Sequence, residues 1–165
     1  MPAIFEPTRA ARLLALAVPL ALLGGAYIGQ YGFGLFPCEM CWWQRYPHFA
    51  ALALALLAFV RAPGRGFVAL AALAIGISGA IGLFHAGVEY GWWEGITRCS
   101  STISSQAGED PLAAVMNAPL IRCDVPQWTL LGVSLAGWNF LFSTAGAAAI
   151  AYLLTRPGKV EKTFP

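Results

Sequence analysis

Two cysteines, Cys38 and Cys41, stand in the segment "FPCEMCWWQRYPH" with two residues between them, and Arg45 follows four positions later. A disulfide between such cysteines closes a very small ring and is the usual arrangement where the bond must open and close. If a helix begins near Cys41, its positive end and an arginine one turn away both favour the thiolate. The segment therefore predicts thiol–disulfide chemistry, although a lipid-phosphate contact is a second interpretation of Arg45.

Two further cysteines, Cys99 and Cys123, complete the four in the chain. A zinc site with four cysteine ligands prefers two close pairs, whereas 23 residues separate these two. A purely structural disulfide between them would close a long loop with a gain of ~3 kcal/mol. An even number of cysteines in an oxidising compartment indicates disulfides. We expect redox-active cysteines and no metal, with structural bridges as the alternative.

The composition indicates the solvent for which the chain is built. Of its 165 residues 58% are hydrophobic and only 11% are charged, which is typical of membrane proteins. The formal net charge of +2 favours neither a nucleic acid nor an acidic substrate. We expect a lipid bilayer as partner and no nucleic acid.

Four intervals are apolar and long enough to cross a bilayer, which takes about 20 residues of helix. The expected spans are about 13–33, 43–60, 66–88 and 130–154. The second span is short unless Arg45 snorkels to the interface. Open sheets cannot satisfy their backbone in lipid, so the sequence predicts an all-α membrane protein, a single domain 1–165 folded as a four-helix transmembrane bundle. Close helix packing is expected at five glycines: Gly24, Gly25, Gly76, Gly79 and Gly82.

The charged residues predict the orientation of this bundle. Seven of the ten basic residues flank the spans on one side: Arg9, Arg12, Arg61, Arg65, Arg156, Lys159 and Lys162. By the positive-inside rule both termini are cytoplasmic, and the loops at about 34–42 and 89–129, which hold all four cysteines, face outward. In the second loop, Asp110 and Pro111 predict the start of a short interfacial helix. A cleaved signal peptide is the alternative for the N-terminus, but the apolar run continues past the length of one.

Three segments, "PCEMCWWQR", "HAGVEYGWWEG" and "CDVPQW", together with the span count, resemble the DsbB family of bacterial inner-membrane, quinone-dependent disulfide oxidoreductases. The resemblance extends over about 13–154. It implies two catalytic redox pairs, Cys38–Cys41 and Cys99–Cys123, with Arg45 and His85 at the quinone. The cofactor it implies is ubiquinone or menaquinone, without a metal. Gln44 departs from the pattern, since some members have an acidic residue there.

The resemblance also implies a mechanism and a location. A DsbA-like periplasmic thiol oxidase would attack the Cys99–Cys123 disulfide, and Cys123 would then attack Cys38, which we expect to be the more exposed cysteine of its pair. Cys41 would pass the electrons to the membrane quinone pool. The expected location is the bacterial inner membrane, with several spans and the active cysteines on the periplasmic face. The alternatives are a thiol redox enzyme like vitamin K epoxide reductase, and a noncatalytic membrane protein with structural disulfides.

Overall fold

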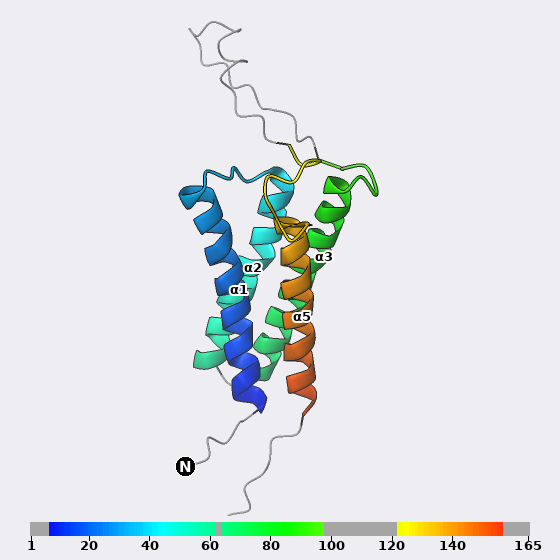
Figure 1. The fold of residues 1–165 in the computed structure, drawn as a ribbon. Coiled ribbons are helices and arrows are strands. Elements are labelled where there is room, and N and C mark those ends of the chain that lie inside the picture. Colours follow the sequence, from blue (N-terminus) through cyan, green and yellow to red (C-terminus); the bar gives the residue numbers. More distant parts are fainter. Residues whose placement is uncertain (1–6, 62–63, 98–121, 157–165) are drawn as a thin grey trace, which may run out of the picture.

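The computed structural model describes residues 7–61, 64–97 and 122–156. Within these ranges the chain forms four long helices, which lie side by side in an elongated bundle, and one short hairpin (Figure 1). The elements are α1 (Pro7–Gly32), α2 (Glu39–Val60), α3 (Gly64–Glu89), β1 (Thr129–Leu130), β2 (Val133–Ser134) and α5 (Leu135–Thr155). The expected interfacial helix after Asp110 lies outside the described residues.

Three of the described helices, α1, α3 and α5, are long and apolar enough to cross a membrane. The fourth, α2, carries Gln44, Arg45 and His48 in its first half, which lowers its mean hydropathy. Large apolar side chains cover the outside of the bundle; Leu20, for example, is 57% exposed. A surface of this kind is costly in water and suits lipid tails. The structure is therefore a largely helical protein with membrane-spanning helices.

The interior of the bundle is built from small side chains. On α1, one residue in four is buried, from Ala11 through Ala15 and Pro19 to Leu23. These alanines pack with buried alanines of α2 and α3 in one cluster. Small residues let helix backbones approach closely, which is how membrane helices gain packing energy in the absence of a hydrophobic drive between them.

The glycines expected at helix contacts differ in their surroundings, and Gly76 of α3 is in ordinary contact with α5, since an added Cβ would lie 3.8 Å from Ala147 Cβ. On α3, a Cβ added to Gly82 would lie 2.9 Å from the Ala136 carbonyl oxygen of α5, and one at Gly79 would lie 3.1 Å from Ser143 Cβ. The expectation of close packing is confirmed there. It was wrong for Gly24 and Gly25 of α1, where an added Cβ would meet nothing within 4 Å.

The helix expected from about residue 130 begins instead at Leu135, after the hairpin β1–β2. Leu131 and Gly132 have positive φ angles of 53° and 77°, which a right-handed helix cannot accommodate. Ser134 is the N-cap of α5, and its hydroxyl accepts a hydrogen bond from the Gly137 N–H at 3.1 Å. A glycine turn followed by a serine cap explains the later start.

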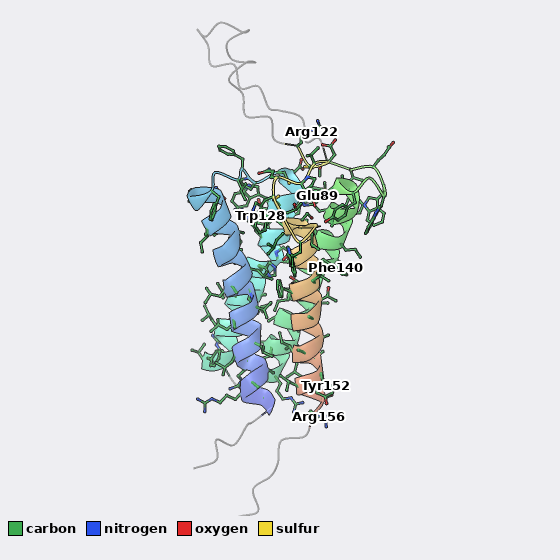
Figure 2. The ribbon with its side chains drawn as sticks, in the orientation of Figure 1. Glu89, Arg122, Trp128, Phe140, Tyr152 and Arg156 are labelled. Carbon is green, nitrogen blue, oxygen red and sulfur yellow. The ribbon has the colours of Figure 1, made fainter. Side chains whose placement is uncertain are left out.

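The two ends of the bundle differ in character. The hairpin, the end of α3 and the connection between α1 and α2 gather at one end, while α1 begins and α5 finishes at the other (Figure 1). Glu89, Arg122 and Trp128 lie at the first end, and Tyr152 and Arg156 lie at the second (Figure 2). Because Cys38 and Cys123 flank the elements of the first end, the described cysteines are collected there.

Candidate redox site and adjoining cavity

The first turn of α2 holds two thiols close together. Cys38 is the N-cap of this helix, and its sulfur accepts a hydrogen bond from the Cys41 N–H at 3.2 Å. The two sulfurs are free and lie 2.8 Å apart. A disulfide bond is about 2.05 Å long, so a small movement of either side chain closes it. The C-x2-C spacing makes Cys38 the N-cap and Cys41 the third helical residue, which brings their sulfurs close enough to form a disulfide.

The burial of the two thiols is the reverse of what the sequence led us to expect. Cys38 is only 2% exposed, whereas Cys41 is partly exposed. The capping side chain turns back over the first turn of α2 and packs with Met40, Val88 and Cys123. This cluster brings a cysteine of the second loop next to the first pair. Cys123 is disulfide-bonded, and Cys99 lies outside the described residues.

Cys38 and Cys41 lie at the start of α2, before the expected span, and their pKa values are shifted in opposite directions. The pKa of Cys41 is lowered, first because the Cys38 thiol donates a hydrogen bond to its sulfur and last because of the positive charge of Arg45. The pKa of Cys38 is raised, first by the same hydrogen bond and then by burial. The arrangement favours a thiol at Cys38 and a thiolate at Cys41.

Arg45 is buried against the neighbouring helix α1. Its guanidinium donates to Gln30 Oε1 at 2.7 Å and to the Ala26 carbonyl oxygen at 3.4 Å, both on α1. It also lies 5.0 Å from the ring centre of Tyr27 and 4.9 Å from that of Trp42. With 7% of its surface exposed, Arg45 ties α2 to α1.

His85, on the last turns of α3, contacts the buried thiol. Its Nε2 lies 3.6 Å from Cys38 Sγ and 3.7 Å from Glu89 Oε1, and its Nδ1 lies 2.8 Å from Gln44 Nε2. The backbone of Cys123 also hydrogen-bonds to this histidine. The structure thus places His85 between the two cysteine loops.

A buried polar network that the sequence reasoning missed continues from Gln44 into the bundle. Asn139 Nδ2 donates to Gln44 Oε1 at 2.8 Å, and His48 Nε2 lies 3.0 Å from Asn139 Oδ1. Ser78 and Ser143 complete it from α3 and α5. The signal was present in the sequence, because polar residues inside apolar helices are expensive and usually functional.

A cavity of about 230 Å³ opens beside the two thiols. Its α1 wall is made of small residues, including Gly25, Ala26 and Gly29. The opposite walls carry the side chains expected to do chemistry, namely Cys38, Cys41, Arg45, His85 and Glu89, with Asn139 and Phe142 from α5. An apolar recess with a few convergent polar groups is the usual form of a small-molecule site.

The same cluster contains three possible metal ligands. The ligand atoms of Cys38, Cys41 and His85 all lie within 4.8 Å of one another. Two thiolates bound at about 2.3 Å to one tetrahedral zinc would lie about 3.8 Å apart. The observed 2.8 Å between the sulfurs is too short for that and fits a dithiol that closes to a disulfide.

These features define a helical membrane protein with a reactive dithiol at one end of its bundle. The chain belongs to the DsbB family, since the family model for disulfide bond formation protein DsbB matches residues 8–153. It is therefore a multi-pass membrane protein of disulfide bond formation, with disulfide-forming oxidoreductase activity.

Curated relatives support the same assignment along most of the chain. A disulfide bond formation protein B from Aromatoleum aromaticum is 31% identical, with 90% of this chain and 93% of the relative aligned. One from Verminephrobacter eiseniae is also 31% identical over 89% of this chain and 86% of the relative. A disulfide bond formation protein B 2 from Pseudomonas syringae is 30% identical, covering 89% and 88%. No solved structure matches the chain.

Proposed function

We propose that this protein is a thiol oxidase of the bacterial inner membrane that reoxidises a DsbA-like periplasmic dithiol and delivers the electrons to a membrane quinone. In this proposal α2 is a fourth span, both termini are cytoplasmic and the cysteines face the periplasm. The observation that carries it is the Cys38–Cys41 dithiol, with its favoured thiolate, on the wall of an apolar cavity between helices.

The residues around the cavity suit a quinone ring. Glycines and alanines of α1 leave room for a flat apolar ring, and Arg45 supplies a buried cation beside Cys41. Arg45 and His85 both line the cavity wall, and Arg45 would hold a ring oxygen through its N–H donors. A bound ubiquinone or menaquinone would supply the acceptor for two electrons and two protons.

The cysteines carry the exchange as a sequence of balanced steps. The partner's thiolate attacks Cys99, the Cys99–Cys123 bond breaks, and Cys123 leaves with the electron pair. Cys123 then attacks Cys38, with which it shares an apolar cluster, and Cys41 leaves as the thiolate. That leaving group is stabilised by the helix start and by Arg45, and it faces the cavity.

The experiment is oxidation of a reduced DsbA-like protein coupled to reduction of decylubiquinone by the purified full chain. Gly25→Leu would fill the cavity, while Gly24→Leu is its matched control, because an added Cβ meets nothing at either glycine and only Gly25 lines the cavity. We expect at least a 10-fold loss of quinone reduction in the first variant and little change in the second. No quinone reduction by the unaltered protein, or equal rates in both variants, would refute the proposal.

A further inference from the structure

The orientation of Gln44 is fixed by a group that can only accept hydrogen bonds. Its side-chain nitrogen lies 3.2 Å from the Met40 carbonyl oxygen, so the NH2 group, and not the oxygen, occupies that side. The same nitrogen lies 2.8 Å from His85 Nδ1. Gln44 therefore donates to His85 through one N–H while the other is held by the backbone.

The hydrogen bond at the oxygen end of Gln44 independently supports the same orientation of its amide. Asn139 Nδ2 lies 3.2 Å from the Ser78 carbonyl oxygen, which fixes the NH2 group of Asn139 there. That group donates to Gln44 Oε1 at 2.8 Å. The Met40 carbonyl thus fixes the orientation of the Gln44 amide, and the Ser78 carbonyl fixes that of the Asn139 amide. The two orientations agree, and neither amide can flip without losing hydrogen bonds on both of its sides.

We propose that Gln44 is a positioning residue that keeps the proton of His85 on Nε2, making the imidazole a hydrogen-bond donor to the Cys38 sulfur. A nitrogen that accepts from Gln44 carries no proton, so the neutral ring carries it on Nε2. That atom lies 3.6 Å from Cys38 Sγ and 3.7 Å from Glu89 Oε1, both of which accept.

An N–H donor beside the Cys38 sulfur has a defined use in the disulfide exchange, and this role of His85 rests on the proposed function. The second thiolate of the partner dithiol first attacks the partner–Cys99 bond and releases Cys99 as a thiolate. Cys99 then attacks Cys123 in the Cys38–Cys123 mixed disulfide, so that the Cys99–Cys123 bond forms and Cys38 leaves with the electron pair. The Nε2–H of His85 stabilises that buried thiolate, which is 2% exposed and has little access to water. Because Nε2 already holds a proton, His85 acts as a donor and not as a base toward Cys38.

The tautomer is measured directly by ring ¹⁵N chemical shifts of the full chain labelled at histidine. The chain has only two histidines, and His48→Gln assigns the spectrum. We expect a protonated Nε2 and a bare Nδ1 for His85. Gln44→Glu keeps an acceptor for Asn139 but presents only oxygens to Nδ1, so the proton should move to Nδ1. A proton on Nδ1 in the unaltered protein, or no change in Gln44→Glu, would overturn the proposal.

A kinetic measurement separates positioning from a merely structural role. The return of Cys38 from the mixed disulfide, followed in a single turnover, should be about 10-fold slower in Gln44→Glu. His85→Gln places an N–H donor near the position of Nε2 and should retain more of the rate than His85→Asn, which reaches only as far as Nδ1. Equal rates for the two would overturn the donor role. Failure of quinone reduction with the expected tautomer would instead count against the proposed function alone.

Discussion

The thiolate at Cys41 should depend more on Cys38 than on Arg45. In the structure the Cys38 thiol is the first cause of the lowered pKa of Cys41 and Arg45 is the last. The guanidinium of Arg45 directs its hydrogen bonds to Gln30 and Ala26 and acts on the sulfur only through space. Cys38→Ala should therefore raise the pKa of Cys41 more than Arg45→Met does.

The size of the effect follows from the bond that is removed. A hydrogen bond to a charged group contributes about 1.5–3 kcal/mol, and Cys38→Ala removes this stabilisation from the Cys41 thiolate. The pKa of Cys41 is lowered, so its thiolate becomes protonated as the pH falls through that pKa. Raising the pKa of Cys41 therefore moves its titration curve to higher pH. At a fixed pH below the pKa of Cys41 in both proteins, the thiolate fraction drops about 10- to 100-fold in the variant.

The assay is the rate of iodoacetamide alkylation at Cys41, followed by peptide mass spectrometry across a pH series on the reduced protein. Cys38→Ser is the matched control, because its hydroxyl keeps a donor at the N-cap and should leave most of the depression in place. If Arg45→Met shifted the curve as far as Cys38→Ala, the ranking of causes would be wrong and the arginine would be the main source of the reactive thiolate.

Three further predictions concern the exchange and the bundle. Cys99→Ser should abolish mixed-disulfide capture of a DsbA-like partner while small dithiols still reduce the Cys38–Cys41 bond, and normal capture on non-reducing gels would refute that assignment. Gly82→Ala should lower the free energy of unfolding in detergent by about 1–3 kcal/mol, because its Cβ would lie 2.9 Å from the Ala136 carbonyl oxygen, whereas Gly66→Ala on the same helix meets nothing and should not. Ser134→Ala should cost about 1 kcal/mol of stability by removing the N-cap of α5, and an unchanged melting temperature would contradict it.

The helices could be predicted from the sequence because lipid leaves few choices for a backbone. Long uncharged runs must form helices if they enter a bilayer, so α1 and α3 include nearly all of the spans expected there. The start of α5 could not be predicted from hydropathy. Leu130 and Leu131 are as apolar as the helix that follows, and the turn depends on the positive φ of Gly132 and on the cap at Ser134.

The site was predictable where spacing along one helix decides the geometry and unpredictable where packing between helices decides it. Cys38 and Cys41 meet because an N-cap and the third helical residue always lie close. The relative exposure of the two thiols depends on Met40 and Val88, and the second of these comes from a different helix. No periodicity in "PCEMC" contains that information.

The role of Gln44 shows the same limit from the opposite side. In the sequence Gln44 is an uncharged amide beside Arg45, and the absence of a charge is all that the sequence alone reveals about it. In the bundle its two ends are held by Met40 of its own helix and Asn139 of α5, 95 positions away, and this pair of anchors determines which nitrogen of His85 carries the proton. An acid at the same position would present only acceptors and would reverse that choice. The identity of one side chain thus matters here through the direction of a hydrogen bond as well as through its charge.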